Sequence, residues 1–530
     1  MAKDRKTAAA WLTAVMALAL LVRLPHVAGT DFPLNDGGLF YVMTTELTNA
    51  GLSLPRFTTY NGGRIPFVYP PLALYTASVT HMITGWPVLT LLRFLPLIAN
   101  LATVLVIFFL GLRILGSQTC AGIAALIFVV LPRSYEFLIM GGGLTRSVGF
   151  LFVSLSLVAG HRVFIERQRP AVIPTAVCLG FAVMSHPEMG LFAAVSLGLL
   201  GLGTGLDRWK LVRGLEVLAG GALVASPWWV TVVLRHGLTS FASATGTSFW
   251  RWKSVTALLS REATGESGLT LLAALALLGL LLSLARGSLV LPLWLVAAFV
   301  VVPRSAPTPA TIPLAMLATL ALTEVVLPVV GADAALGAAV VPRRRSVIAA
   351  KWAAAAGWRR AARIGVVVAV LVYSLYFSNL RRTSEPWDSL RSVSAAERQA
   401  MAWVEANTAP GSTFLVATTS GSWWIDPVDA WFPALTSRTS VATPNGAEWL
   451  PHSEFGRRVE EYNALRGCLR LDERCLAAWS ARFGETFSHV YVSKAPGPAT
   501  IGDRRSGGLA DDPKLVVLYD GPGATVFSMK

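Results

Sequence analysis

Long blocks of apolar residues, separated by short polar segments, fill the chain up to about residue 380. Crossing a bilayer takes about 20 mostly apolar residues in a helix, because a helix satisfies its own backbone hydrogen bonds in lipid. The pattern therefore predicts a polytopic α-helical membrane protein with about eleven spans. They lie near residues 8–27, 88–112, 117–132, 146–164, 171–185, 188–206, 212–234, 267–285, 288–302, 309–330 and 363–379.

From Ser384 onward the sequence mixes polar and apolar residues, as expected for a water-soluble domain. We predict two parts, a membrane module over residues 1–383 and a soluble domain over residues 384–530. Helical spacing favours a helix over Ala395–Asn407, and β-rich runs favour strands. The predicted strands are Thr413–Ala417, His489–Ser493 and a closing hairpin made by Lys514–Tyr519 and Ala524–Met529, which indicates an α/β domain.

Composition and charge agree with this division. Hydrophobic residues make up 54% of the chain and charged residues only 14%, against about 25% in soluble proteins. The net charge of +15 comes from Lys and Arg that gather in alternate loops, with a dense run between Arg343 and Arg363. This is the positive-inside bias of a plasma-membrane protein with a cytoplasmic N-terminus. An odd number of spans then places the C-terminal domain outside the cytoplasm, and we expect membrane lipid rather than nucleic acid as a partner.

The first apolar segment has a second interpretation. Val27-Ala28-Gly29 offers small residues after a basic start, as in a cleaved signal peptide. Its apolar stretch is long for a signal peptide, so we favour a retained helix.

The four cysteines form two pairs of different character. Cys120 and Cys178 fall inside predicted spans, as small apolar residues. Cys468 and Cys475 lie in the soluble domain, where they form either a short disulfide loop or two unpaired thiols. No metal-ligand spacing, Walker A loop, nucleophile elbow or dinucleotide fingerprint occurs in the sequence.

The longest outside loop, residues 28–86, lies between the first two spans. It begins with the acidic segment Asp31–Tyr41, continues as an amphipathic stretch to Gly51, and then becomes rich in turns around Arg56–Arg64. A Tyr69-Pro70-Pro71-Leu72 element leads into a second short apolar helix that ends at Gly85. Both predicted helices are too short to span, so we expect them at the membrane interface, with Gly51 as a helix cap.

This loop resembles the GT-C superfamily of membrane glycosyltransferases, and more narrowly the bacterial branch related to protein O-mannosyltransferases and aminoarabinose transferases. The resemblance rests on the acidic motif after the first helix, the amphipathic loop and the Tyr-Pro-Pro-Leu segment, and extends to the helix count and the outer domain. It implies transfer of a sugar from a polyprenyl-phosphate donor to an acceptor outside the cytoplasm. It also implies that a carboxylate of the first outside loop is the catalytic base.

Carried onto this sequence, the base is Asp36, with Asp31 as the runner-up. An inverting transfer needs a carboxylate that takes the proton of the acceptor hydroxyl as the sugar leaves its phosphate. Asp36 follows the outer end of the first helix, and Gly37 and Gly38 after it allow close approach of a substrate. Many relatives carry an adjacent Asp-Glu pair here, whereas this chain has Asn35-Asp36-Gly37. The second acidic group of the pattern therefore stays unassigned. The plainer interpretation of Asn-Asp-Gly-Gly is a turn.

Other outside loops supply candidates for substrate binding. A glycine run before Arg146 suits a phosphate, although an arginine anchored at the interface explains it equally. His186-Pro187-Glu188 lies between two spans, either as a simple helix break or as part of a site. The candidate set is Arg56, Arg64, Tyr69, Arg146, His186 and Glu188, with Arg56 and Arg64 as alternative phosphate partners.

In the soluble domain, residues 423–433 and 445–449 form loops that are dense in aromatic and acidic residues. Aromatic faces beside carboxylates suit carbohydrate binding, and they equally suit docking of the domain onto the membrane module.

The sequence therefore predicts an inverting membrane glycosyltransferase with a lipid-linked donor and a saccharide, lipid or protein acceptor. A non-catalytic assembly protein and a lipid or polysaccharide transporter are the alternatives. The cofactor is unknown: carboxylates can hold a divalent cation beside a donor phosphate, but no spacing indicates a metal site.

Overall fold

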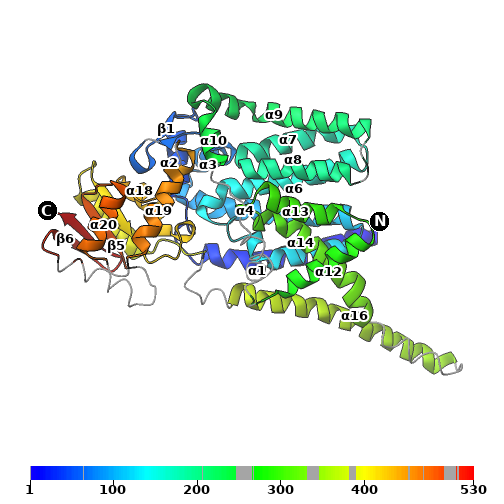
Figure 1. Cartoon of the computed structure of the whole chain (residues 1–530). Coiled ribbons are helices and arrows are strands. Elements are labelled where there is room, and N and C mark those ends of the chain that lie inside the picture. The colour runs from blue at the N-terminus through cyan, green and yellow to red at the C-terminus, as the bar shows by residue number, and fades with distance from the viewer. Residues whose placement is uncertain are drawn as a thin grey trace.

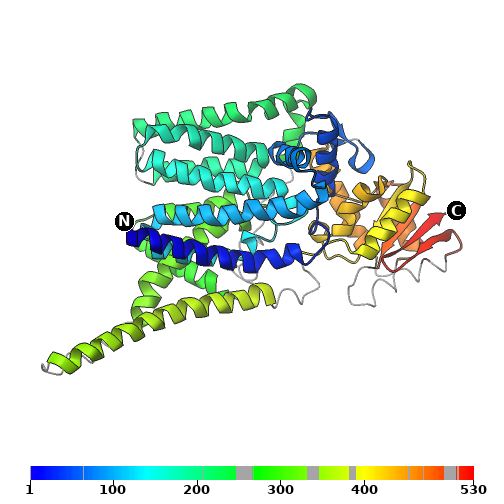
Figure 2. The same ribbon diagram turned by 180° about the vertical axis from the view of Figure 1, so that it is seen from behind.

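The computed structural model describes residues 2–63, 65–203, 205, 207–245, 266, 268–330, 345–380, 389–451, 454–468, 471–494, 509 and 512–530. A bundle of long helices is joined at one end to a smaller domain that carries a sheet (Figure 1). The N-terminus and the projecting end of helix α16 lie at the opposite end of the bundle (Figure 2). The predicted architecture, membrane helices followed by an α/β domain, is confirmed.

The apolar helices coincide one for one with the eleven predicted spans. Among the described residues, six helices are long and apolar enough to cross a membrane and five more are shorter. Their bounds are α1 (Ala2–Ala28), α4 (Val88–Leu115), α5 (Gln118–Val130), α6 (Leu144–Phe164), α7 (Val172–Ser185), α8 (Pro187–Leu202), α9 (Arg208–His236), α12 (Leu271–Ala285), α13 (Val290–Val301), α14 (Pro307–Ala321), which continues to Val330, and α16 (Arg345–Leu375).

Segments predicted to be cytoplasmic contact one another. Three ion pairs at their end of the bundle join residues from different segments, as expected if these connections share one side of the membrane, while Arg213–Glu216 and His161–Glu166 each lie within one segment. The three pairs between segments are Arg113–Glu166, Arg167–Asp207 and Arg286–Glu324. The predicted alternation of the connections between the two ends of the bundle is therefore consistent with the structure.

A buried arginine ties the first helix to its neighbours near the other end. Arg23 donates from Nε to Asn100 Oδ1 of α4 at 2.6 Å and from Nη2 to Ser134 Oγ at 2.9 Å. Its Nη1 donates to the carbonyl oxygen of Val129 in α5 at 3.2 Å. A fully buried guanidinium is tolerated in apolar surroundings only when such partners satisfy it. The network therefore fixes the C-terminal end of α1 beside the turn that follows α5.

The loop over residues 28–86 forms α2 (Gly38–Asn49), a small antiparallel pair of strands β1 (Phe57–Thr58) and β2 (Ile65–Pro66), and α3 (Leu72–Thr84). Helix α2 packs against α18 (Pro427–Thr436) of the C-terminal domain, so the loop lies between the two parts of the molecule (Figure 1). Ala50 occupies the C-cap of α2, and Gly51 follows it with φ +60°. The prediction of Gly51 as the helix cap was therefore one residue too far along the chain.

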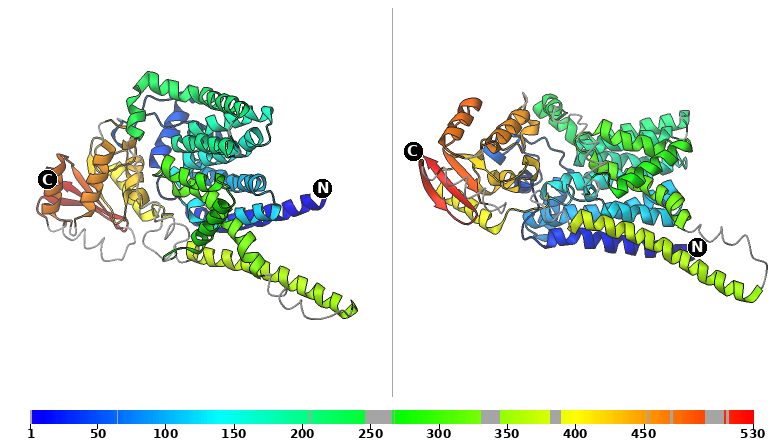
Figure 3. Two further views of the ribbon diagram at one scale, coloured as in Figure 1. Left: turned by 45° about the vertical axis from the view of Figure 1, so that its right-hand side comes forward. Right: turned by 60° about the horizontal axis from the view of Figure 1, so that its bottom comes forward.

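The C-terminal domain is built on a five-stranded sheet in the order β4-β3-β5-β7-β6. This domain lies at the end of the molecule away from the N-terminus (Figure 3). Strand β3 runs parallel to β4 and β5, while β7 is antiparallel to both β5 and β6, which confirms the closing hairpin. The elements are α17 (Ala395–Asn407), β3 (Thr413–Ala417), α18 (Pro427–Thr436), β4 (Thr439–Ser440), α19 (Glu454–Arg466), α20 (Glu473–Phe483), β5 (His489–Ser493), β6 (Leu515–Asp520) and β7 (Ala524–Met529). The predicted boundary at residues 383 and 384 lies outside the described residues.

The prediction of a loop over residues 423–433 was wrong in part, because most of these residues are helical. Asp426 caps α18, with its Oδ1 accepting from the backbone N–H of Asp429 at 3.1 Å, and Pro427 occupies the first helical position. Both are favourable helix-start signals.

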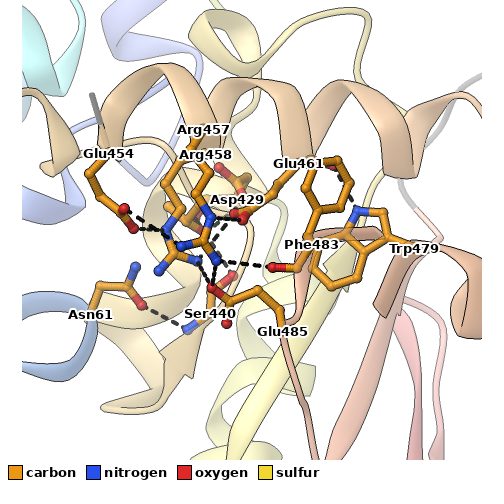
Figure 4. A network of polar contacts seen from close by, with 11 residues as sticks. Asn61, Asp429, Ser440, Glu454, Arg457, Arg458, Glu461, Trp479, Phe483 and Glu485 are labelled. Atoms are coloured by element: carbon orange, nitrogen blue, oxygen red, sulfur yellow. Dashed lines mark hydrogen bonds and ion pairs between the residues drawn. The ribbon is translucent and has the colours of Figure 1, made fainter. Parts of the chain in front are cut away.

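Two sets of interactions hold the outer part of this domain together. Cys468 and Cys475 form a disulfide, which resolves the alternative left open by the sequence. Figure 4 shows Arg457 and Arg458 of α19 inserted among carboxylates, with Arg457 Nε 2.8 Å from Oε1 of the buried Glu461. The same view shows the backbone N–H of Ser440 donating to Asn61 of the first loop at 2.7 Å.

Candidate active site

Asp36 lies where the loop after α1 meets the turn between α5 and α6. The backbone N–H of Gly141 donates to the carbonyl oxygen of Leu34, and that of Gly142 to the carbonyl oxygen of Asp36, both at 2.9 Å. A Cβ atom at Gly142 would lie 2.5 Å from Cγ of Asp36. The glycine run before Arg146 therefore makes room for the carboxylate of Asp36.

The surroundings of Asp36 suit a proton acceptor. The residue is half-buried, and its Oδ1 atom is enclosed without a hydrogen-bond partner. Burial raises the pKa of the Asp36 carboxyl, while the charge of Arg146 and the N–H of Gly142 lower it and the charge of Glu448 raises it further. Desolvation makes a carboxylate more basic, as a general base requires.

Arg146 and His186 lie on the bundle side of this carboxylate. Arg146 Nη1 donates to the carbonyl oxygen of Phe137 at 3.1 Å, and its Nε is buried without a hydrogen-bond partner. The Nδ1 atom of His186 is likewise buried without a partner. Burial lowers the pKa of His186 well below its usual value, and the charges of Arg146 and Arg304 lower it further. The imidazole is therefore neutral at physiological pH.

Tyr69, from the Tyr-Pro-Pro-Leu element, lies in the same region. Its ring meets the ring of Phe40 edge-on at a centroid distance of 4.7 Å, Trp449 at 5.5 Å and His186 at 6.4 Å. Burial raises the pKa of its hydroxyl, and the nearby charge of Arg146 opposes that rise. The structure thus brings together four of the predicted site residues, Asp36, Tyr69, Arg146 and His186.

Two further charged residues belong to the site. Sequence reasoning missed Arg304, and it considered Glu448 only as part of the loop over residues 445–449 that suits carbohydrate binding or docking. In the C-terminal domain, Oε1 of Glu448 lies 3.7 Å from Nη2 of Arg304. Its Oε2 accepts a hydrogen bond from the backbone N–H of Gly446 at 2.8 Å. Arg304 comes from the connection between α13 and α14. A cation in a short connection between two predicted spans could have indicated Arg304 as a site residue. Glu448 is 412 positions from Asp36 along the chain, and no local pattern links the two.

Glu188 belongs to the edge of this cluster. It lies in the first turn of α8, where the helix dipole favours a carboxylate. The hydroxyl of Ser305, next to Arg304, donates to its Oε2 atom. Glu188 therefore links α8 to the connection that carries Arg304.

Asp31 has a different environment from Asp36. It is exposed, and its carboxylate pairs with Arg398 of α17, whose Nη1 lies 3.2 Å from Oδ1. The hydrogen bond from Arg398 holds the pKa of the Asp31 carboxyl below its usual value. Asp31 thus fastens the first loop to the C-terminal domain.

The two alternative phosphate partners lie apart from this cluster or cannot be placed. Arg56 is exposed, with its guanidinium 5.9 Å from the ring centroid of Phe57, and its charge acts on His236 at the end of α9. Arg64 lies outside the described residues.

The aromatic residues of the C-terminal domain divide between the two roles considered for them. Trp423 lies under the guanidinium of Arg304 at 5.7 Å, and Trp449 meets Tyr69, so both contact the membrane module. Trp424 is 48% exposed. Docking is confirmed for Trp423 and Trp449, and carbohydrate binding stays a prediction.

Chemically, the site combines one enclosed carboxylate with two guanidinium groups and a neutral imidazole at the junction of both parts of the molecule. Within the described ranges, no three His, Cys, Asp or Glu side chains gather where they could hold a metal ion. The arrangement suits proton abstraction next to an anionic leaving group.

No family model matches the sequence, and no curated protein matches it significantly. Solved structures do match. ArnT from Cupriavidus metallidurans in the apo state has a TM-score of 0.54 and 16% identity, over 98% of each chain. The same protein bound to undecaprenyl phosphate gives a TM-score of 0.52 and 14% identity, again over 98% of each.

Two other solved structures share the fold. The apo oligosaccharyltransferase of Archaeoglobus fulgidus matches with a TM-score of 0.53 and 16% identity over 92% of this chain and 69% of its own. The mycobacterial arabinofuranosyltransferase AftD matches with a TM-score of 0.54 and 16% identity. The match covers 98% of this chain and 41% of AftD. All of these proteins are GT-C glycosyltransferases. The chain therefore has the fold of the GT-C membrane glycosyltransferases.

Proposed function

We propose that this protein is a membrane glycosyltransferase that moves a sugar from a polyprenyl-phosphate donor to an acceptor hydroxyl, with Asp36 as the general base. The observation that carries the proposal is the enclosed, unpartnered Oδ1 atom of Asp36 beside Arg146. Its fold neighbour ArnT binds undecaprenyl phosphate, which supports a lipid-linked donor.

In the proposed reaction, Asp36 takes the proton of the acceptor hydroxyl as its oxygen attacks the anomeric carbon of the sugar. The bond from that carbon to the donor phosphate breaks, and the polyprenyl phosphate leaves with the bonding electron pair. Attack from the face opposite the phosphate inverts the anomeric centre. The proton then leaves Asp36 for solvent, which restores the carboxylate.

Arg146 and Arg304 supply the positive charge that the leaving phosphate needs. A guanidinium offers several donors to phosphate oxygens, and the unpartnered Nε of Arg146 leaves one donor unused in the free protein. The neutral His186 and the Tyr69 hydroxyl are suited to orient a sugar or phosphate oxygen without adding charge. If a divalent cation assists, Asp36 and Glu448 are the carboxylates that would help to hold it.

The C-terminal domain and the site are proposed to lie outside the cytoplasm. The N-terminus and the predicted cytoplasmic segments lie at the other end of the bundle (Figure 2). A disulfide between Cys468 and Cys475 also fits an oxidising compartment.

The proposal is tested by sugar transfer in purified protein reconstituted in lipid. A panel of radiolabelled undecaprenyl-phosphate sugars is offered with a membrane extract that supplies saccharide, lipid and protein acceptors. Transfer by the wild type that is lost in folded Asp36→Asn is the expected result. Transfer that survives the substitution would move the base to Asp31 or Glu188. Tight binding of undecaprenyl phosphate without transfer from any donor would favour a non-catalytic assembly protein, and movement of a lipid or glycan across the vesicle membrane would favour a transporter.

A further inference from the structure

The segment that carries Asp36 is held by the C-terminal domain as well as by the bundle. The indole Nε1 of Trp431 in α18 donates to the carbonyl oxygen of Asn35, the residue before Asp36, at 2.8 Å. Trp431 is fully buried, and its ring meets Phe32 edge-on at a centroid distance of 4.6 Å. A side chain from residue 431 thus contacts the backbone next to the proposed base.

The same indole ring also closes the other side of Asp36. Gly37 has φ +136°, and a Cβ atom there would lie 3.0 Å from Cζ2 of Trp431. A Cβ atom at Gly38 would meet the carbonyl oxygen of Ala430 even more closely. The backbone before and after Asp36 therefore packs directly against two consecutive residues of α18.

The backbone at Asn35 has an uncommon conformation that several further contacts hold. Its φ is +50°, a left-handed conformation that costs energy and persists only where surrounding contacts fix it. The Asn35 Nδ2 donates to the carbonyl oxygens of Ser389 at 3.0 Å and Trp424 at 3.1 Å. The backbone N–H of Asn35 donates to the carbonyl oxygen of Arg391 at 2.6 Å. These three oxygen acceptors belong to residues 389–424, beyond the membrane module, while Nδ2 also donates to Sδ of Met140 in the bundle at 3.4 Å.

We infer that Trp431 is a positioning residue for Asp36, which makes the C-terminal domain part of the catalytic apparatus. The inference rests on the proposed function, because it gives Trp431 a role only through the base. The hydrogen bond to Asn35 fixes the peptide adjoining Asp36, and the indole ring limits movement of the peptide that follows. A catalytic group must be held within about 0.5 Å of its working position, and a displacement of about 1 Å can cost about 100-fold in rate.

The test variant is Trp431→Phe, which keeps an aromatic ring against Phe32 and Gly37 and removes the N–H donor. The matched control is Trp479→Phe. Trp479 is also a buried tryptophan of the same domain, in α20, and its Nε1 donates to the carbonyl oxygen of Glu461 at 2.9 Å. Both substitutions delete one indole hydrogen bond to a backbone carbonyl, so melting temperatures of the two variants show whether they cost similar stability.

The first measurement needs no substrate and uses the full chain in lipid nanodiscs. Hydrogen exchange is followed at the backbone N–H groups of Asn35, Gly141 and Gly142, which tie the Asp36 segment to both parts of the molecule. We expect exchange in peptides covering these residues to rise about tenfold or more in Trp431→Phe and to stay unchanged in Trp479→Phe. Equal exchange in Trp431→Phe and wild type would overturn the inference.

The second measurement uses whichever undecaprenyl-phosphate sugar the wild type turns over. We expect Trp431→Phe to lower kcat by about tenfold or more and to leave the KM for the donor within about twofold. The acidic limb of its pH profile should move to lower pH, because water admitted beside Asp36 reverses part of the effect of burial on its pKa. An equal loss in Trp479→Phe, or a raised KM with unchanged kcat, would assign Trp431 a general structural or binding role.

The two proposals fail in distinguishable ways. Activity that survives Asp36→Asn removes the proposed base, whatever Trp431 does. An inactive Asp36→Asn together with a Trp431→Phe enzyme of wild-type kcat and pH profile keeps the base and overturns only the positioning role.

Discussion

Gly142 lies so close to the carboxylate of Asp36 that a Cβ atom on it would stand 2.5 Å from Oδ2. A methyl group there must displace the carboxylate, because the backbone of Gly142 is itself hydrogen-bonded to Asp36 at 2.9 Å. We expect Gly142→Ala to reduce kcat by at least about tenfold, since a misplaced base loses its geometry for proton transfer. The measurement is sugar transfer by reconstituted protein, with the melting temperature recorded alongside.

Gly198→Ala is the matched control for that substitution. Gly198 lies in α8, and no atom stands within 4 Å of a Cβ placed on it. It should leave kcat unchanged. Wild-type turnover in Gly142→Ala would mean that the carboxylate need not remain where the structure has it.

The pH dependence of transfer follows from the burial of Asp36. Burial raises the pKa of this carboxyl above its ordinary value near 3.8, and the base works only when ionised. Activity should therefore be full at higher pH and decline as pH falls through the raised pKa. A pH profile of kcat in the wild type checks this. An acidic limb at or below pH 3.8 would contradict an enclosed base at position 36.

Arg146 and Arg56 were rival candidates for the donor phosphate, and the structure separates them. The charge of Arg146 acts on Asp36, Tyr69 and His186, whereas Arg56 is exposed beside Phe57. We expect Arg146→Ala to weaken undecaprenyl phosphate binding by about tenfold or more, with partial recovery in Arg146→Lys, since lysine keeps the charge but loses the planar fork. Titration of each variant in nanodiscs measures this. A larger loss in Arg56→Ala would move the phosphate site to the end of α9.

The sequence alone predicted the parts of the fold that depend on local pattern. Apolar blocks located the eleven apolar helices found among the described residues, because lipid requires a run of apolar residues in each membrane helix. The role given to Asp36 came from its place after the first helix. The hydrogen bond from Trp431 to Asn35, and the effect of the Glu448 charge on Asp36, join positions about 400 residues apart. Nothing in a single sequence records which distant segments meet, so these partners required the structure.

Stretches governed by competing local signals were the least predictable. Residues 427–436 contain two prolines, which favour a loop, yet Asp426 and Pro427 begin a helix there. At the start of this helix, the side chain of Asp426 accepts a hydrogen bond from the backbone N–H of Asp429, which has no partner within the helix. A cap residue followed at once by proline was the signal to weigh more heavily.

The disulfide between Cys468 and Cys475 closes a short loop, with a sequence separation of 7. By loop-closure entropy it should contribute about 2–3 kcal/mol to the stability of the C-terminal domain. Replacing both cysteines by serine should lower the melting temperature of that domain, as measured by calorimetry. A maleimide reagent that labels both thiols in the native, unreduced protein would contradict the pairing.

The central claim, that Asp36 is the base, is tested most directly by comparing Asp36→Asn with Asp31→Asn. Donor affinity is measured with undecaprenyl phosphate and kcat with the active sugar donor, in the same nanodisc preparations. We predict that Asp36→Asn loses at least about 100-fold in kcat, as expected when a general base is removed, with affinity within about twofold. Asp31→Asn, which loses only its ion pair with Arg398, should keep most of its kcat. A fully active Asp36→Asn, or an inactive Asp31→Asn beside it, would contradict the account.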